Sequence, residues 1–303
     1  MMTQMLMDGL IAGTMIGLGA IGITLTYSIL RFANFAHGEL ISWGAYAALA
    51  VSSALGILWQ PLAAPIGPFS FGWSLPLALV IAMALTGLLA LLVDLVLFGP
   101  LRKRTAAVII LVMAGFGAAL TLRSLLEFLF TTKPAYFTRT LQIAMPLGGG
   151  ARATPDQLLS LAVAALAVAG LHVLLTHTAV GRAMRAVSEN PQLAGLSGID
   201  VRRTIRIVWV LGAALACLAG VMAGLIVQIR PHMGHDLLLP LFAAAILGGI
   251  GSVPGAMLAG LIVGLAEALC VQLVGAEWRA AVAFVILVAV LLLRPQGIMG
   301  RPT

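Results

Sequence analysis

Long apolar stretches dominate this chain, and a short polar segment separates the first two of them. Gly9–Leu30 and Ile41–Leu58 contain no Asp, Glu, Lys, Arg or His. A helix needs about 20 apolar residues to cross a bilayer. The chain is 61% hydrophobic and 9% charged, whereas soluble domains carry about 25% charged residues. A soluble fold could not bury this much apolar surface, so we expect a membrane protein that crosses the bilayer several times.

The apolar stretches predict an all-α fold, a polytopic integral membrane protein with about eight or nine transmembrane helices. They lie at 9–30, 38–58, 73–99, 107–130, 157–177, 205–229, 237–250, 254–274 and 280–294. The stretches 237–250 and 280–294 are short for a full span, and the first is compatible with half of a discontinuous helix. No water-exposed stretch reaches the roughly 100 residues of a soluble domain. Residues 1–303 are therefore expected to form a single transmembrane domain.

Lys and Arg predict the orientation, because short cytoplasmic loops carry an excess of both. The basic loop Arg102–Arg104 and the loop 178–204 are separated by two spans, so both are assigned to the cytoplasmic side. Arg294 and Arg301 place the C-terminus there too if 237–274 crosses twice. Counting back then leaves the N-terminus outside, unless a re-entrant segment near residue 35 reverses that side. The net charge of +7 is explained by this asymmetry. No basic stripe with interleaved aromatic residues indicates a nucleic-acid partner.

The polar segment between the first two spans, Phe32–Leu40 (FANFAHGEL), contains Asn34, His37 and Glu39. Polar groups at membrane depth are costly and usually mark a pathway or a structural joint. We expect the three side chains to form a hydrogen-bonded joint that avoids lipid. Substrate contact remains open as their role beside helix packing, and packing is the favoured expectation.

The cytoplasmic loop 178–204 has the pattern of two short helices. Asn190 and Pro191 suit the cap and first position of a helix over residues 191–197, and Gly198 suits its left-handed end. Leu193 and Leu196, three residues apart, share one face of this helix. An apolar face on a cytoplasmic helix indicates a protein partner, but an ordinary connector between spans remains an equal alternative.

Glycine and proline interrupt the apolar pattern at Leu247–Gly255 (LGGIGSVPG). A discontinuous helix lining a path and a tight turn between two helices both fit this pattern. The non-helical backbone is expected to extend from residue 248 to 255. In the fourth span, Arg123 and Glu127 lie four residues apart and are expected to pair. Asp94 and Glu267 are single intramembrane acids that fit either a helix contact or a pathway.

Several signatures of chemistry are missing from the sequence. No G-x-x-x-x-G-K-[ST] loop occurs, so the chain is not expected to bind or hydrolyse ATP itself. No H-E-x-x-H motif or cysteine ligand pair occurs, so neither a metal site nor a catalytic residue is expected. Cys217 and Cys270 both lie in apolar stretches and fit core packing.

Four segments in order resemble the permease subunit of branched-chain amino acid ABC importers of the LivH type. They are FANFAHGEL, GRAMRAVSENPQLAGLSGI, AAAILGGIGSVPGAMLAGLIVGLAEAL and LLLRPQGIMGRP. The resemblance implies a multi-pass permease in the bacterial inner membrane, paired with a second related permease. It also implies two separate cytoplasmic ATPase subunits that bind ATP and Mg²⁺, and a periplasmic binding protein that delivers the substrate. No cofactor is implied for this chain itself.

The resemblance carries specific residues with it. The polar joint corresponds to Asn34, His37, Gly38 and Glu39. The ATPase-coupling loop corresponds to Gly181, Arg182, Arg185, Glu189, Gly198 and Ile199. Asn190, Leu193 and Leu196 are assigned to the same loop by the helix pattern, and so is Pro191, which lies outside the family pattern. The glycine-rich break corresponds to Gly248, Gly249, Gly251, Pro254 and Gly255.

Two alternatives to this function follow from the sequence. Permeases of the same type carry urea or short amides, and these motifs do not separate their substrates. An ion-coupled secondary transporter would instead use Asp94, Glu267 and the Arg123–Glu127 pair as its coupling network. The segment 178–204 argues against the second alternative, because a transporter that works alone does not need a capped cytoplasmic helix with an apolar face.

Overall fold

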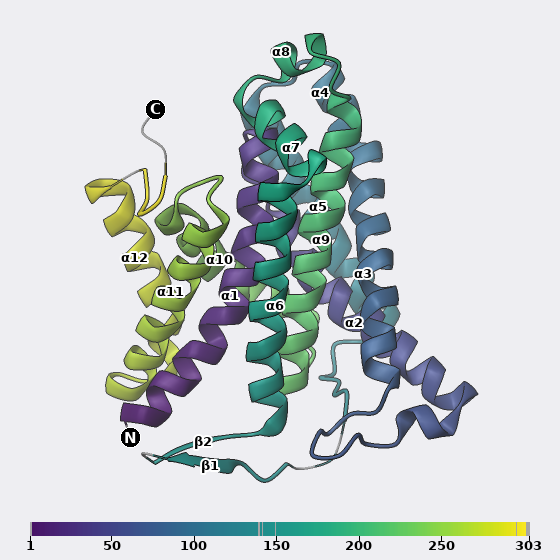
Figure 1. The fold of residues 1–303 in the computed structure, drawn as a ribbon, viewed down its shortest axis with the longest axis vertical. Coiled ribbons are helices and arrows are strands. Elements are labelled where there is room, and N and C mark those ends of the chain that lie inside the picture. The colour runs from purple at the N-terminus through teal and green to yellow at the C-terminus, as the bar shows by residue number, and fades with distance from the viewer. Residues whose placement is uncertain (1, 139, 141, 149, 295, 301–303) are drawn as a thin grey trace.

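The computed structural model describes residues 2–138, 140, 142–148, 150–294 and 296–300. It is helical apart from one small antiparallel hairpin (Figure 1). The helices are α1 (Met2–Leu30), α2 (Ala36–Leu58), η1 (Gln60–Ala63), α3 (Ser74–Val93), η2 (Asp94–Phe98), α4 (Gly99–Lys103), α5 (Val108–Phe130), α6 (Pro155–His177), α7 (Ala179–Glu189), α8 (Pro191–Leu196), α9 (Val201–Ile226), α10 (Met233–Gly248), α11 (Val253–Leu273), η3 (Ala276–Trp278) and α12 (Arg279–Leu293), and the strands are β1 (Met145–Gly148) and β2 (Ala151–Ala153).

Eight helices in the described residues are long and apolar enough to cross a membrane, and α10 is a ninth, shorter apolar helix. This confirms the predicted all-α membrane fold. Two spans are composite: α3, η2 and α4 run on as Ser74–Lys103, and η3 continues into α12. The short stretch expected at 237–250 is α10, with 16 residues.

The centre of the protein is formed by α1 and α9. In the most apolar 18-residue stretch of each helix, 89% of the residues of α1 and 72% of those of α9 are buried. The corresponding shares are 11% for η3–α12 and 17% for α6. Helix α1 packs on α11, α9 and α10, and α2 packs on α3 and α9. The outer helices expose large apolar side chains, as a bilayer requires, so the buried positions of α1 and α9 identify the core.

Small residues bring α1 and α11 into backbone contact. Gly9, Gly13 and Gly17 recur every four residues on α1 and face α11. A Cβ atom added at Gly264 would lie 2.4 Å from the Cα of Gly13. Glycine at such positions lets membrane helices approach closely and gain van der Waals contact. The packing of α1 on α11 therefore depends on glycines that the hydropathy pattern does not single out.

Replacing Gly264 with Val should lower the thermal unfolding temperature of the detergent-purified protein, because the side chain would enter the α1 backbone. We expect a loss of about 1–3 kcal/mol, the usual cost of overpacking. Gly170→Val on α6 is the matched control, since no atom lies within 4 Å of a Cβ added there. Equal melting of the two variants would contradict the close α1–α11 contact.

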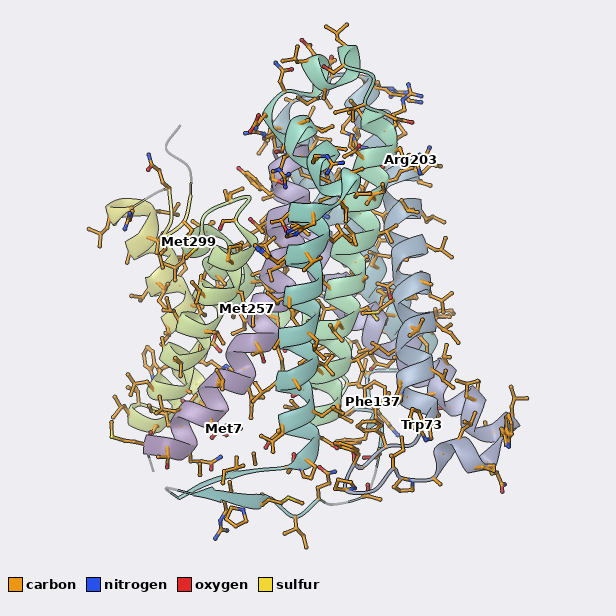
Figure 2. All side chains as sticks on the ribbon, viewed as in Figure 1. Met7, Trp73, Phe137, Arg203, Met257 and Met299 are labelled. Carbon is orange, nitrogen blue, oxygen red and sulfur yellow. The ribbon has the colours of Figure 1, made fainter. Side chains whose placement is uncertain are left out.

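The two ends of the bundle differ in charge. Helices α4, α7 and α8 gather at one end, and the N-terminus and the β1–β2 hairpin lie at the other (Figure 1). Arg203 lies at the first end, whereas Met7, Trp73 and Phe137 lie at the opposite end (Figure 2). The basic segments thus lie at one end of the bundle, as the predicted orientation requires. Arg301 lies outside the described residues.

Candidate functional site

The three polar residues between the first spans are buried away from lipid. Residues 31–35 connect α1 to α2, and His37 and Glu39 lie in the first turn of α2. The exposed fractions are 2% for Asn34 and 0% for His37 and Glu39. Among the described residues no hydrogen bond joins the three side chains to one another. Each has its own contact, so the single hydrogen-bonded joint expected from the sequence is not what the structure shows.

Asn34 and His37 fix the start of α2. The Asn34 Oδ1 accepts a hydrogen bond from the Ala36 N–H at 3.1 Å, an Asx turn that satisfies a free donor of the helix. The His37 ring lies against α1, where a Cβ added at Gly22 would be 2.6 Å from the imidazole. The missing side chain at Gly22 therefore makes room for the ring.

Gly38 allows α10 to begin directly on α2. A Cβ added at Gly234 would lie 1.9 Å from the Gly38 carbonyl oxygen, so the two backbones touch. The Gly234 N–H donates to the Ser42 Oγ at 2.9 Å. This hydrogen bond satisfies a helix N–H that lacks an intrahelical acceptor. The polar segment thus joins α1, α2 and α10.

Glu39 pairs with Arg123 of α5, and this corrects the expected Arg123–Glu127 pair. The Arg123 Nη2 and Nε donate to the Glu39 Oε1 at 2.7 and 3.2 Å. The Glu39 side chain is 0% exposed, against 28% for Glu127. A fully buried carboxylate needs a charged partner more than one with access to solvent. The spacing within one helix therefore gave the wrong partner.

Glu127 instead lies beside α10. Its Oε1 is 3.3 Å from the Nε2 of His232, the residue just before α10 begins. Nearby on the same segment, Arg230 and Asp236 approach to 3.9 Å. Ionisable groups from α2, α5 and α10 therefore gather where these three helices meet. No cluster of three His, Cys, Asp or Glu side chains in the described residues could hold a metal ion.

Aromatic side chains adjoin the same junction. The Phe35 ring lies 5.2 Å from that of Phe242 on α10 and 6.3 Å from that of Phe116 on α5. Phe116 is 47% exposed. The Trp43 Nε1 donates to the Leu122 carbonyl at 3.0 Å. The junction thus presents aromatic faces beside its ion pairs.

The glycine-rich break is a tight turn between two helices. Helix α10 ends at Gly248 and α11 begins at Val253, so the expectation of non-helical backbone from 248 to 255 is wrong at both ends. Gly249 and Gly251 adopt φ of +93° and +90°, a region that favours glycine. Pro254 and Gly255 lie in the first turn of α11, where Pro is well tolerated because its missing N–H needs no partner.

The backbone groups freed at this turn are satisfied by protein. The N–H groups of Ile298 and Met299 donate to the carbonyls of Leu247 and Gly248 at 2.7 and 3.2 Å. The Gly251 N–H donates to the Thr24 Oγ1 of α1 at 2.7 Å. The C-terminal segment therefore caps α10, which explains how an open helix end is tolerated in the bundle.

The two turn glycines should respond differently to substitution. A Cβ at Gly249 would lie 2.3 Å from the Gly300 backbone nitrogen, whereas the nearest atom at Gly251 is 3.7 Å away. Both substitutions meet the cost of a positive φ, about 1 kcal/mol, but only Gly249 adds a clash. Gly249→Ala should therefore lower the melting temperature and transport more than Gly251→Ala. Equal effects would show that the C-terminal segment does not pack on this turn.

The segment 178–204 is built as two capped helices. The Asn190 Oδ1 accepts from the N–H groups of Gln192 and Leu193, both at 3.0 Å. Gly198 has φ of +84° after α8. Leu193 and Leu196 of α8 are 61% and 87% exposed. The short helix is therefore fixed at both ends and presents two leucines that the chain itself leaves uncovered.

The remaining residues of this segment support α7. The Arg185 guanidinium donates to the Leu175 carbonyl at the end of α6, and the Arg31 guanidinium donates to the Ser188 carbonyl. Arg182 and Glu189 are exposed at the surface. The segment is thereby attached both to α6 and to the chain just before the polar joint.

Several residues of these sites were missed by sequence reasoning. Gly22, Thr24 and Gly234 each contact a residue at least 15 positions away in the chain. The only local signal was the repeated small residue in α1 and the glycine at 234, which a search for small-residue spacing could have found.

Comparisons with known proteins match nearly the whole length of the chain. The family model described as branched-chain amino acid transport system / permease component matches residues 5–291. The high-affinity branched-chain amino acid transport system permease protein LivH of Escherichia coli (strain K12) is 33% identical over 307 residues, covering 99% of this chain and 96% of that protein. The corresponding protein BraD of Pseudomonas aeruginosa is 33% identical over 308 residues, with the same coverage.

Among solved structures, PsaBC from Streptococcus pneumoniae in complex with Fab is similar, with 13% identity and a TM-score of 0.49 over 95% of this chain and 91% of that one. Nothing about function follows from that distant likeness. The family match covers nearly all of the residues, and the two permeases match over almost their full lengths. The chain therefore belongs to the family of permease components of branched-chain amino acid transport systems.

Proposed function

We propose that this chain is the membrane-spanning permease subunit of an ATP-binding-cassette importer that carries branched-chain amino acids across a bacterial inner membrane. A second related permease completes the path, and a periplasmic binding protein delivers the substrate. Two separate cytoplasmic ATPase subunits bind ATP and Mg²⁺ and drive transport. The chain itself then moves substrate without catalysing a chemical reaction.

The exposed leucine pair of α8 carries this proposal. Leu193 and Leu196 lie on a helix of six residues at the basic end of the bundle, 61% and 87% exposed. Exposed apolar side chains on a rigid, capped element suit a groove on a partner protein. An ATPase docked there would press on α7 and, through Arg31, on the segment that leads to the polar joint.

The proposed path runs along the junction of α2, α5 and α10. Intramembrane polar groups are rare and usually face a path or a partner helix. Here the Glu39–Arg123 pair and the Glu127–His232 contact lie at the same three-helix junction as the rings of Phe35 and Phe116, with Phe116 further towards the beginning of α5. An amino acid carries both charges and an apolar side chain, so this mixture of groups suits its passage.

The ion pairs give little support to a secondary transporter. Asp94 pairs with Arg102 at 2.6 Å and Glu267 pairs with Arg279 at 2.5 Å. Neither pair shares a residue with Glu39–Arg123. A proton or ion relay needs groups within reach of one another, but Asp94–Arg102 lies within the composite span Ser74–Lys103 and Glu267–Arg279 joins α11 to α12.

Uptake assays test the substrate class. A strain that lacks this chain should lose uptake of radiolabelled leucine at micromolar concentration, and the wild-type chain should restore it. Unlabelled isoleucine and valine should compete with leucine, whereas urea and acetamide should not. Unchanged leucine uptake together with lost urea uptake would overturn the amino-acid assignment in favour of a urea or amide permease.

A further inference from the structure

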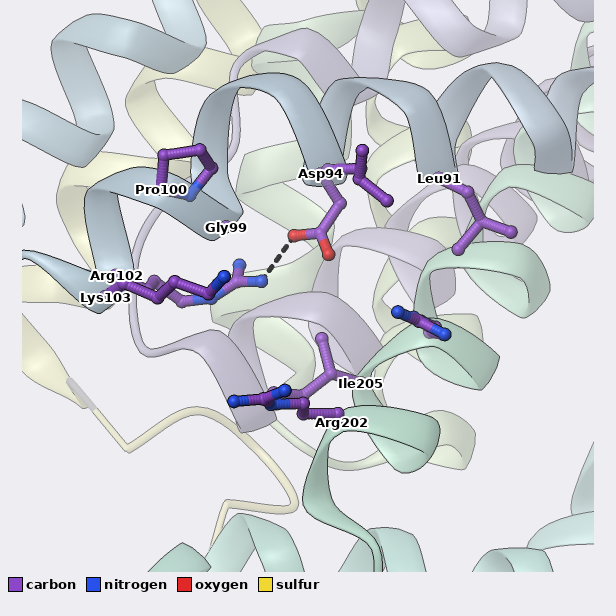
Figure 3. A pocket seen from close by; sticks show the side chains of 10 residues that line it. Leu91, Asp94, Gly99, Pro100, Arg102, Lys103, Arg202 and Ile205 are labelled. Atoms are coloured by element: carbon purple, nitrogen blue, oxygen red, sulfur yellow. Dashed lines mark hydrogen bonds and ion pairs between the residues drawn. The ribbon is translucent and has the colours of Figure 1, made fainter.

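A basic pocket lies at the cytoplasmic end of the bundle, apart from the junction of α2, α5 and α10. It has a volume of about 630 Å³ and lies between α4 and the beginning of α9 (Figure 3). Its cationic lining consists of Arg102 and Lys103 from α4, with Arg202 and Arg206 from α9. Arg202 and Arg206 are four residues apart, so they share one face of the helix.

Proline shapes one wall of this pocket. A proline inside a helix has no N–H and its ring collides with the carbonyl four residues earlier. Just before Pro100 the helix widens into the π-helical turn η2 (Asp94–Phe98), and the Gly99 N–H donates to the Asp94 carbonyl five residues back. The wider turn brings the Asp94 side chain to face Arg102 (Figure 3). Such single π turns often occur at functional sites.

The positive charge of the pocket is largely uncompensated. Arg102 donates to the Asp94 Oδ1 at 2.6 Å. Within the described residues, Lys103, Arg202 and Arg206 form no ion pair with a carboxylate. The Arg102 Nη1 is buried and has no hydrogen-bond partner in the described protein. Buried donors usually have a partner, so these groups call for an anion from outside the chain.

The pocket also adjoins the lipid-facing surface. Leu91 and Leu95 of the α3–η2 span line it together with Ile205. On the same span, Leu88, Leu92 and Leu95 are 62%, 58% and 66% exposed, as expected for side chains that face acyl chains. A ligand here would place a charged group among arginines and an apolar tail against α3.

We propose that this pocket binds the phosphate headgroup of an anionic phospholipid from the cytoplasmic leaflet, with the acyl chains along α3. Basic pockets between spans on the cytoplasmic side suit such headgroups, and the arginine fork matches phosphate oxygens with two parallel hydrogen bonds. The bound lipid would hold α4 to the beginning of α9, the helix that follows the coupling helix α8. A soluble phosphate shares the headgroup chemistry but has no tail to use the apolar wall.

Binding of short-chain lipids to the full-length chain in detergent tests the proposal. Dioctanoyl phosphatidylglycerol should bind the wild type more tightly than dioctanoyl phosphatidylcholine, measured by native mass spectrometry. Arg202→Gln with Arg206→Gln should weaken phosphatidylglycerol binding roughly 30-fold, because each cation near an anionic lipid contributes about fivefold. Should that variant fold poorly, Lys103→Gln should still weaken binding about fivefold.

The matched control removes equal charge outside the pocket. Arg203 and Arg104 neighbour the pocket in sequence but do not line it, so Arg203→Gln with Arg104→Gln should leave affinity within about threefold. Equal loss in both double variants, or equal binding of phosphatidylcholine, would overturn the site. Displacement of phosphatidylglycerol by equimolar inorganic phosphate would overturn the lipid assignment. If the variant with Arg202→Gln and Arg206→Gln keeps its lipid affinity but loses ATPase stimulation, the pocket is a protein contact instead.

Discussion

Replacing Leu193 and Leu196 together with Asp should abolish substrate-stimulated ATP hydrolysis while the chain still inserts and folds. Both side chains are exposed on α8, so their loss costs the isolated chain little stability. In a docked groove the two carboxylates would be buried without partners, at a cost of several kcal/mol. The measurement is ATP hydrolysis by the reconstituted transporter with and without loaded binding protein.

A control on the same helix separates docking from a general effect of charge. Gln192→Asp adds an acid to α8 beside Leu193 without removing a leucine and should retain most of the stimulation. Leu196→Asp alone should lose more ATPase stimulation than this control does. Leu196 is 87% exposed, so it is available to dock, and the variant would place a charge in the groove. Stimulation at the wild-type level in the double variant would mean that 178–204 is only a connector.

Replacing Arg123 with Leu should destabilise the protein by about 3–5 kcal/mol, because the buried Glu39 would lose its charged partner. The Glu39 side chain is 0% exposed and its Oε2 has no partner in the described residues. Glu39→Leu with Arg123→Leu should recover much of the loss, since an apolar pair often replaces a buried ion pair at little cost. Thermal unfolding in detergent measures both changes.

The same double variant distinguishes the two roles of the polar joint. A stable double variant that still transports would indicate that Glu39 and Arg123 serve packing, whereas a stable but inactive one would place them on the path. Arg104→Leu, at an exposed position, is the control for loss of an arginine. If Arg123→Leu changes the free energy of unfolding by less than about 0.5 kcal/mol, the result would contradict the buried pair, since changes that small are typical of surface sites.

Much of the fold could be predicted because its determinants are local. The apolar runs located the spans, since a bilayer requires a fixed apolar length. Asn190, Pro191 and Gly198 defined α8, because capping depends on neighbours in sequence. The fold around α8 was therefore readable from a few adjacent residues.

The contacts between distant segments could not be read in this way. Arg123 was assigned to Glu127 because spacing within one helix says nothing about the helix packed beside it. Gly38 resembled a family motif, but its contact with Gly234 depends on how α10 is placed. The capping of α10 by Ile298 and Met299 joins segments about 50 residues apart, and hydropathy does not report such hydrogen bonds.

Leucine uptake into proteoliposomes under defined energy sources tests the central proposal most directly. The chain reconstituted with its second permease, both ATPases and loaded binding protein should accumulate leucine only when ATP and Mg²⁺ are supplied on the ATPase side. Collapsing proton and sodium gradients should leave that uptake intact. Uptake by this chain alone, driven by an ion gradient without ATP, would contradict the importer assignment.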